Sequence, residues 1–259
     1  MEAKSVSEYL TYINTLFETE SIEKLWYRGQ GKLNVRYKLL PSIYRSSTTN
    51  NVEYDLFQRF KAKAVPFLKY KPATEWDWLF LMQHYGVPTR LLDWTEDALI
   101  ALAFAVEKRK TEDANEEDAC VWILNPFKLN QQFNAFEDYQ FIPNIEEQLI
   151  VDNFKMLPAR EMTIGRPMHR LEHPIAVIGS MNSDRIIAQK GVFTLFPQPF
   201  NNVTSLEESK NNEEFLYKIV IKKEHIDIIK QELIRFGITE NSLYPSMDSI
   251  ALEINRDLG

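Results

Sequence analysis

The segment from residue 83 to residue 106, QHYGVPTRLLDWTEDALIALAFAV, constrains the fold more than any other part of this chain. It starts on the last turn of an expected helix, which Gly86 ends and Pro88 prevents from continuing. A short extended segment, TRLLD, follows over residues 89–93, and Thr95 is the expected N-cap of the next helix. That helix, EDALIALAFAVEK, is apolar on almost every side, which indicates that it is buried.

The rest of the chain shows helical patterns first and strand patterns later. Apolar residues at helical spacing predict helices over residues 5–18, 53–68, 75–85, 96–108 and 224–236. Runs rich in Val, Ile and aromatic residues predict strands over residues 24–30, 119–125, 174–179, 185–196 and 215–223. Residues 128–172 have no clear pattern. Residues 1–110 are therefore expected to be helix-rich and 115–259 strand-rich, which indicates a single α+β domain whose helical part packs on a mostly antiparallel sheet.

The composition limits the cellular setting and the partners. One cysteine, Cys120, excludes an internal disulfide, and its apolar surroundings predict a buried thiol in a reducing cytoplasm. No apolar run approaches the ~18 residues of a membrane span, and residues 1–10 lack a signal-peptide core, so we expect no membrane contact. The formal net charge of −7 argues against a general affinity for nucleic acid.

Motifs for common cofactors are missing from the sequence. There is no phosphate-binding loop ending in GK[ST], no GxGxxG and no GxSxG elbow. His169 and His173 lie four residues apart without a further ligand cluster, so we expect no metal site. Two segments nevertheless carry more polar side chains than a purely structural role requires, YRGQG over residues 27–31 and QHYGVPTRLLDWT over residues 83–95.

Both polar segments have a structural and a functional interpretation. Arg28 lies in a short aromatic strand before two glycines, where it can bind a flat or anionic ligand or pair with a core carboxylate such as Asp93. Arg90 can brace its turn through an ion pair with Asp93 or contact a ligand. Gln83 and His84 have no evident structural task, and we expect them to support the site residues from behind.

Five strings of the sequence resemble the bacterial FRG domain family, which is named for its aromatic-Arg-Gly motif. They are YRGQ (27–30), LLPSIYR (39–45), LMQHYGVPTRLLDWTEDALIALAFAV (81–106), AQKGVFTLF (188–196) and LIRFGITENSLYPSMDSIA (233–251). The resemblance extends over about residues 20–253 and implies one FRG-like domain over residues 1–259. The family is distantly similar to the ADP-ribosyltransferase superfamily, so it also implies a core like the split sheet of those enzymes and NAD as a substrate.

The superfamily resemblance implies a nucleotide site made of three elements. Arg28 and Gly29 take the place of the first-strand arginine and small residue that hold the ribose and phosphate region. The string DWT over residues 93–95 takes the place of the second strand, before the helix ALIALAFA, and Gln189 takes the place of the third-strand glutamate. The implied catalytic residues are Arg28, Asp93, Thr95 and Gln189, and the implied nucleotide contacts are Tyr27, Arg28, Gly29, Gln30, Tyr44, Arg90 and Trp94. Of these, Tyr27, Tyr44 and Trp94 are the candidates to stack on a planar ring of the ligand.

The neutral side chain of Gln189 departs from the superfamily pattern. Cleavage of the bond between nicotinamide and ribose develops positive charge on the sugar, as in glycoside hydrolysis, and an amide does not offset that charge. Asp93 or Glu96 then supplies the missing charge, the target carries its own nucleophile, or the nucleotide is bound without turnover.

These observations lead to two main hypotheses. The first is an ADP-ribosyltransferase-like enzyme, without a metal, that uses NAD to modify a protein or nucleic-acid acceptor or hydrolyses NAD, as a toxin or phage-defence effector. The alternative is a non-enzymatic module that senses a nucleotide or a phage component. A third, nucleic-acid processing, fits poorly with the acidic net charge.

Overall fold

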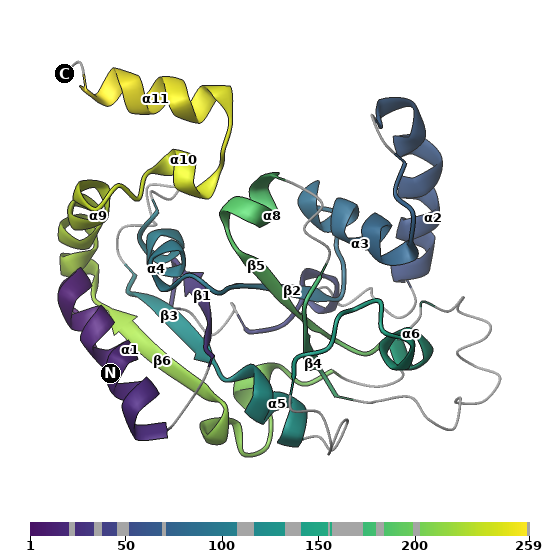
Figure 1. Ribbon diagram of the computed structural model, residues 1–259, viewed down its shortest axis with the longest axis horizontal. Helices are drawn as coiled ribbons and strands as arrows, with labels where there is room; N and C mark the ends of the chain where they lie inside the picture. The colour runs from purple at the N-terminus through teal and green to yellow at the C-terminus, as the bar shows by residue number, and fades with distance from the viewer. Residues whose placement is uncertain are drawn as a thin grey trace.

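The structure, a computed structural model, describes residues 1–20, 24–33, 38–45, 52–68, 71–107, 117–132, 141–154, 156, 173–179, 184–198 and 203–257. These residues form α-helices and six strands, which Figure 1 shows in their spatial arrangement. The strands are β1 (Trp26–Gln30), β2 (Leu91–Thr95), β3 (Ala119–Leu124), β4 (Ile175–Val177), β5 (Gly191–Leu195) and β6 (Leu216–Ile221). The helices are α1 (Val6–Glu20), α2 (Val52–Ala64), α3 (Glu75–His84), α4 (Ala98–Val106), α5 (Pro126–Gln132), α6 (Gln148–Phe154), α8 (Asp184–Ala188), α9 (Ile226–Arg235), α10 (Glu240–Leu243) and α11 (Met247–Asp257).

The six strands form one sheet in the order β4-β5-β2-β1-β3-β6, and each pair of neighbours is antiparallel. The α+β class expected from the sequence is thereby confirmed. The junction between β1 and β2 differs from the others, because its register consists of the single pair Tyr27 and Thr95. The neighbouring pairs, β1 with β3 and β2 with β5, each run over five residue pairs. The sheet therefore consists of two three-stranded halves that are joined at one point.

Helices cover one face of each half-sheet. Because side chains alternate along a strand, Tyr27 and the paired Thr95 point to the same face of the sheet. On this face α1, α4 and α9 pack on the half with β1, β3 and β6, while α3 and α6 pack on the half with β2, β5 and β4 (Figure 1). The opposite face carries a second core around Trp26, Trp94 and Phe196, with Leu129 of α5. Two groups of helices thus flank the junction between β1 and β2.

Most of the expected elements occur, and one was assigned to the wrong class. The expected strand over residues 185–196 is a short helix, α8, followed by a turn and then β5. Strand β2 begins at Leu91 and ends at Thr95, two residues later than the expected 89–93. The capping box of α3 is present, with Thr74 and Asp77 bonded reciprocally, and Gly86 follows the helix with φ of 75°. His169 lies outside the described residues.

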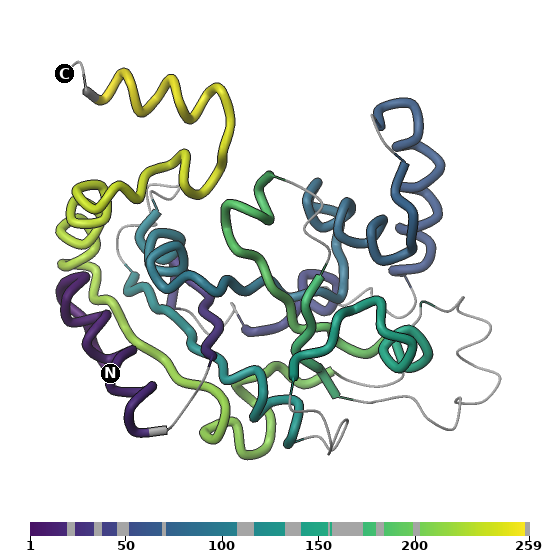
Figure 2. Tube along the Cα trace, in the orientation of Figure 1, coloured from purple at the N-terminus to yellow at the C-terminus, as the bar shows by residue number. Residues whose placement is uncertain are grey.

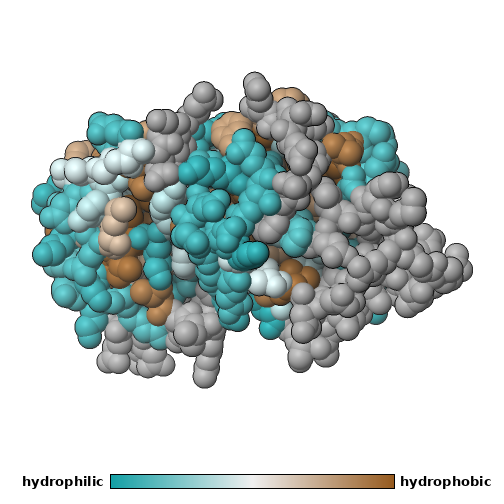
Figure 3. Space-filling view, turned by 90° about the horizontal axis from the view of Figure 1, so that it is seen from below, coloured by the Kyte–Doolittle hydropathy of each residue, from teal (hydrophilic) through white to brown (hydrophobic). Residues whose placement is uncertain are grey.

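The visible surface is largely polar (Figure 3), and the single cysteine is buried. The coloured residues on the face seen in Figure 3 are mostly hydrophilic, with small separate apolar patches. Cys120 is fully buried, and burial raises its pKa to about 12, so the expectation of a buried thiol is confirmed. Near the C-terminus α10 contacts α8, and α11 follows α10 and extends away from the sheet (Figure 2).

Helix α4 begins one turn after β2, and its N-cap is Asp97 rather than the expected Thr95. The Asp97 carboxylate accepts hydrogen bonds from the backbone N–H groups of Leu99 (3.0 Å) and Ile100 (3.3 Å), and Lys190 donates to it at 2.8 Å. Burial pushes the pKa of Asp97 upward, but the Lys190 and backbone hydrogen bonds outweigh it and lower the pKa below its ordinary value.

Replacing Asp97 by alanine is expected to lower the free energy of unfolding by about 1 kcal/mol at pH 7. Because the pKa of Asp97 is lower in the folded state, its stabilisation is complete above the unfolded pKa of about 4 and is lost as pH falls further. Urea unfolding at pH 7 and pH 3 measures the difference, and Asp97→Asn is the control that keeps the cap but removes the charge. An Asp97→Ala deficit of equal size at both pH values would contradict this assignment.

Candidate nucleotide-binding site

A pocket of about 250 Å³ lies at the junction between β1 and β2, where the two half-sheets separate. Strand β1, the C-terminal part of α3, strand β2, helix α4 and the α8–β5 turn all contribute to its lining. Nine of the residues expected from the sequence line it, namely Tyr27, Arg28, Gly29, Gln83, His84, Asp93, Trp94, Thr95 and Gln189. Residues from three distant parts of the chain therefore meet at one place.

Arg28 reaches from β1 across the junction to β2. Its Nη1 donates a hydrogen bond of 2.5 Å to the backbone oxygen of Asp93 and lies 4.0 Å from the Asp93 Oδ2. Burial lowers the pKa of Arg28, and Asp93 opposes this effect, so the guanidinium remains charged at neutral pH. The structural interpretation of Arg28 is confirmed by its contact with Asp93, and its place in the pocket lining leaves ligand binding as a prediction.

The Asp93 carboxylate is held by Gln83 from the end of α3. Gln83 Nε2 lies 3.0 Å from each carboxylate oxygen, and Gln83 Oε1 in turn accepts a hydrogen bond from the Thr89 hydroxyl. The Asp93 side chain is nevertheless 53% exposed, so its oxygens remain accessible to a ligand. Gln83 thus has the supporting position expected from the sequence. His84 lies beside it at the pocket wall, where burial and the charge of Arg185 lower its pKa.

Thr95 and Gln189, expected as two separate ligand contacts, are joined by a hydrogen bond. The Thr95 hydroxyl donates to the Gln189 backbone oxygen (2.5 Å) and accepts from the Asp97 N–H (2.9 Å), and Thr95 is only 4% exposed. Gln189 follows α8 and precedes β5, so it lies in a turn and not on the third strand as expected. Its Nε2 donates to the Leu243 oxygen at 2.6 Å. The second strand and the α8–β5 turn are therefore fastened together.

Two aromatic residues expected to stack on a ligand are core residues. Trp94 is 3% exposed, packs in the core opposite α4 and donates from Nε1 to the Thr194 hydroxyl at 3.1 Å. Tyr27 is 4% exposed and packs in the core under α4, and burial raises its pKa. The ring faces of both are already in contact with protein, which corrects the expectation that either provides a free stacking surface.

Three of the expected nucleotide contacts do not line the pocket. Arg90 is completely buried and pairs with Glu53 of α2, because its position one residue before β2 turns it away from the junction. Gln30 bonds to the Lys32 oxygen and accepts from Trp122, and the Tyr44 hydroxyl donates to the Pro197 oxygen at 2.7 Å. These three side chains have structural partners, so their assignment as ligand contacts is corrected.

Gly29 has a packing role that the sequence did not reveal. A Cβ at this position would lie 2.0 Å from the Ala101 oxygen and 2.6 Å from the Ala105 nitrogen, both on the backbone of α4. The expected reason for this glycine was close approach of its backbone to a ligand. The structure shows that close approach of α4 to β1 already requires it, although Gly29 also lines the pocket.

The sequence did not reveal one cation and three aromatic residues of the pocket. Arg185 of α8 lines it, together with Phe80, Phe104 and Phe193. Phe80 and Phe193 contact one another with ring centroids 4.8 Å apart. The apolar residues at 80, 104 and 193 look like ordinary core positions in the sequence, and Arg185 lies in a segment that was assigned to a strand. Only the folded chain places them around one space.

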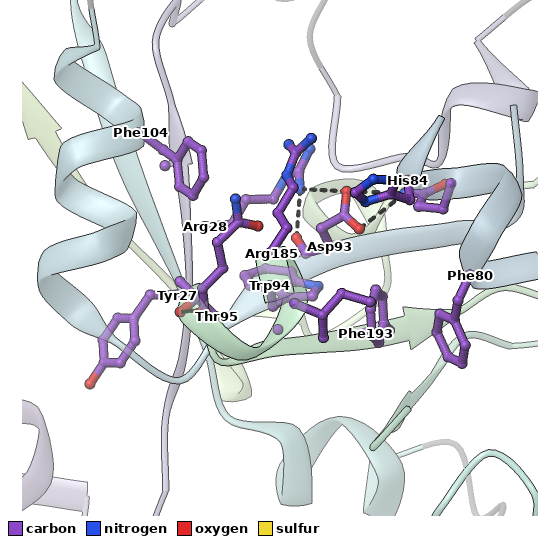
Figure 4. Close-up of a pocket in the computed structure, with 15 residues that line it drawn as sticks. Tyr27, Arg28, Phe80, His84, Asp93, Trp94, Thr95, Phe104, Arg185 and Phe193 are labelled. Atoms are coloured by element: carbon purple, nitrogen blue, oxygen red, sulfur yellow. Dashed lines mark hydrogen bonds and ion pairs between the residues drawn. The ribbon is translucent and has the colours of Figure 1, made fainter. Parts of the chain in front are cut away.

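The lining residues make the pocket locally positive. Among the described lining residues, two arginines, Arg28 and Arg185, stand against one carboxylate, that of Asp93, whereas the whole chain carries a net charge of −7. In Figure 4 both arginine side chains rise toward the same upper part of the pocket, and Phe80 and Phe193 lie below them. A space with cations at one end and aromatic side chains at the other suits a ligand that is anionic at one end and planar or apolar at the other.

The described residues contain no group of three or more His, Cys, Asp and Glu side chains that could hold a metal ion. Among these same residues, no helix has the length and apolar character required to cross a membrane.

Comparison with known proteins gives one match. The family model described as FRG domain matches residues 23–114, which contain β1, α2, α3, β2 and α4. No curated protein and no solved structure matches the chain. The α8–β5 turn and the C-terminal segment lie outside the matched residues, although strings from both resemble the family. Residues 23–114 of this chain, which carry Arg28 and Asp93 of the pocket, are thus similar to the FRG domain family.

Proposed function

We propose that the pocket binds NAD and that the chain cleaves the bond between nicotinamide and ribose, in the manner of an ADP-ribosyltransferase. The observation that carries this proposal is the meeting of Arg28, Asp93, Thr95 and Gln189 in one pocket. The opening of the sheet between β1 and β2 also supports it, since a split sheet is expected of that superfamily. A pocket of about 250 Å³ is small beside the ~300–1,000 Å³ typical of ligand sites, so one part of the dinucleotide lies outside it.

The residues of the pocket have distinct tasks in this reaction. Arg28 uses one guanidinium nitrogen on the Asp93 backbone, and its remaining N–H groups are suited to an anionic phosphate. Asp93, the only carboxylate among the described lining residues, stabilises positive charge as it develops on the ribose. The bond electrons leave with nicotinamide, the ribose carbon bonds to an oxygen of water or of an acceptor, and the proton of that oxygen passes to Asp93 or solvent.

Thr95 and Gln189 act on the shape of the site rather than on the chemistry. The buried Thr95 hydroxyl donates a hydrogen bond to Gln189 and accepts one from Asp97, so it holds the α8–β5 turn against β2. Gln189 Nε2 is bonded to Leu243, which leaves its Oε1 to accept a hydrogen bond from a ribose hydroxyl. Gln189 then orients the sugar, and Asp93 alone provides the negative charge.

Binding of a nucleotide without turnover is the second candidate function. It is favoured by the neutral Gln189 and by the position of Asp93, whose carboxylate is already shared by Gln83 and the nearby Arg28. A carboxylate engaged in this way offers less to a developing cation than a free one. The two candidates differ in one observable, the release of nicotinamide.

Incubation of the purified chain with NAD and bacterial lysate tests the proposal. We expect the wild type to release nicotinamide, and we expect Arg28→Ala and Asp93→Asn each to reduce the rate by about 10²–10³. Arg59→Ala and Asp55→Asn are matched controls, because this exposed pair on α2 does not line the pocket. Absence of nicotinamide release from folded wild type would refute turnover, and calorimetric binding of unchanged NAD in that case identifies the second candidate.

A further inference from the structure

Arg185 stands out among the pocket residues because it pairs with no carboxylate in the part of the chain that the structure describes. Within the described residues no ion pair or hydrogen bond of its side chain occurs, and the guanidinium carbon lies 5.0 Å from the ring centroid of Tyr244. Arg185 is nevertheless half-buried at the pocket wall. A partly desolvated arginine that lines a pocket and pairs with no acidic side chain among the described residues is suited to an anionic ligand.

Tyr244 fixes the position of Arg185 from the C-terminal segment. Its ring meets Phe104 of α4 edge to face, with centroids 5.8 Å apart, and its hydroxyl donates to the Glu107 Oε2 at 3.0 Å. The preceding residue, Leu243, accepts the hydrogen bond from Gln189. The end of α10 therefore joins α4 to α8 and the α8–β5 turn, and it holds that wall of the pocket in place.

The positive charge of the pocket comes from two separate elements. Arg28 projects from β1 and Arg185 from α8, and both side chains extend toward the same part of the pocket (Figure 4). The third basic group, His84, has a pKa lowered by burial and by Arg185, so it is neutral at neutral pH. Two fixed guanidinium groups remain, and each presents several N–H donors in one plane, a geometry that matches phosphate oxygens.

We propose that Arg28 and Arg185 together bind a diphosphate group, and that Tyr244 is the residue that positions Arg185. The identification of this group as the diphosphate of NAD rests on the proposed function, whereas diphosphate binding itself requires no turnover. A nucleic-acid backbone fits the site less well, because the pocket holds about 250 Å³ and the chain has a net charge of −7. The inferred ligand is a small nucleoside diphosphate compound.

Calorimetric titration with ADP-ribose and with inorganic pyrophosphate tests the role of Arg185. We expect Arg185→Gln to weaken the binding of both probes by about 10- to 100-fold, the usual effect of losing hydrogen bonds to a charged group. Arg59→Gln, on the exposed face of α2, is the matched control and is expected to bind like the wild type. Equal affinity of Arg185→Gln and wild type, or absence of binding of both probes to the wild type, would overturn the inference.

Nicotinamide release and diphosphate binding, measured on the wild type and on Arg185→Gln, distinguish this inference from the proposed reaction. Diphosphate binding that depends on Arg185, without nicotinamide release by the wild type, supports the inference and refutes the reaction. Nicotinamide release with a KM for NAD that Arg185→Gln leaves unchanged supports the reaction and refutes the inference.

A double-mutant cycle tests the positioning role of Tyr244. Tyr244→Phe keeps the ring under Arg185 and is expected to bind ADP-ribose within about twofold of the wild type, whereas Tyr244→Leu weakens binding by roughly 3- to 10-fold. If Tyr244 acts through Arg185, Tyr244→Leu has little further effect in the Arg185→Gln background. An equal loss in both backgrounds, in variants shown to be folded by their thermal transitions, would refute the positioning role.

Discussion

Glu53→Gln is expected to lower the free energy of unfolding by about 3–5 kcal/mol, because it leaves the charge of Arg90 buried without a counter-charge. The Glu53 carboxylate lies 3.2 Å from the Arg90 Nε and accepts a hydrogen bond of 3.0 Å from the Arg90 backbone N–H. The two side chains are 5% and 0% exposed, so water does not replace either partner. Burial raises the pKa of Glu53 and Arg90 opposes this rise, as expected for a buried ion pair.

Urea unfolding followed by tryptophan fluorescence measures this loss. Asp55→Asn is the matched control, since Asp55 pairs with Arg59 on the same helix but both side chains are largely exposed. Its expected cost is below about 1 kcal/mol. In the double variant Glu53→Leu/Arg90→Met, which removes both charges, most of the stability is expected to return. A Glu53→Gln loss no larger than that of Asp55→Asn would contradict the account.

The buried pair also decides between the two roles that the sequence left open for Arg90. Arg90 stands three residues before Asp93, close enough in the chain for an ion pair between the two side chains or for a ligand contact. Along β2, however, side chains alternate, so Asp93 and Thr95 face the pocket while Trp94 enters the opposite core. Arg90 finds its partner in Glu53, which is 37 residues earlier in the chain. No local pattern in the sequence encodes such a contact.

The parts of the site that could be predicted are those with strong local signals. Residues 83–106 predict the end of α3, a strand that the structure places two residues later, and the buried α4 after it, and this order brings Asp93 into contact with Arg28. Helix α8 has only five residues, and so short a helix depends on tertiary contacts rather than on a periodic pattern. Arg185 was missed for that reason, because its place in the pocket depends on α8 and on Tyr244, 59 residues later in the chain.

The open junction between β1 and β2 accounts for the position of Arg28. Alternation places Arg28 on the face of β1 opposite to Tyr27, away from α4. In a fully paired sheet its side chain would remain on that face. Because β1 and β2 pair only at Tyr27 and Thr95, the guanidinium reaches across to the Asp93 backbone and borders the pocket. The pocket thus depends on the incomplete pairing of the sheet, which the sequence pattern of each strand alone does not reveal.

Gly29→Ala is expected to be the most damaging single substitution near the pocket, with a loss of at least about 3 kcal/mol in the free energy of unfolding or failure to fold. The added Cβ would lie 2.0 Å from the Ala101 oxygen and 2.6 Å from the Ala105 nitrogen. Both are backbone atoms of α4, so rotation of a side chain does not relieve the contact. Helix α4 would have to move away from β1, and the core that it shares with α1 and α9 would loosen.

Gly86→Ala is the control that separates crowding from backbone strain. Gly86 has φ of 75°, and a Cβ there meets no atom within 4 Å, so the expected cost is about 1 kcal/mol from the left-handed conformation alone. Thermal and urea unfolding of both variants, with ADP-ribose titration of each folded protein, distinguish the two explanations of Gly29. If the glycine serves only the approach of a ligand, Gly29→Ala keeps wild-type stability and loses affinity for ADP-ribose. If the packing of α4 requires the glycine, the free energy of unfolding of Gly29→Ala falls. The two neighbouring residues then have different tasks, since Arg28 lines the pocket and Gly29 allows α4 to pack on the strand that carries Arg28.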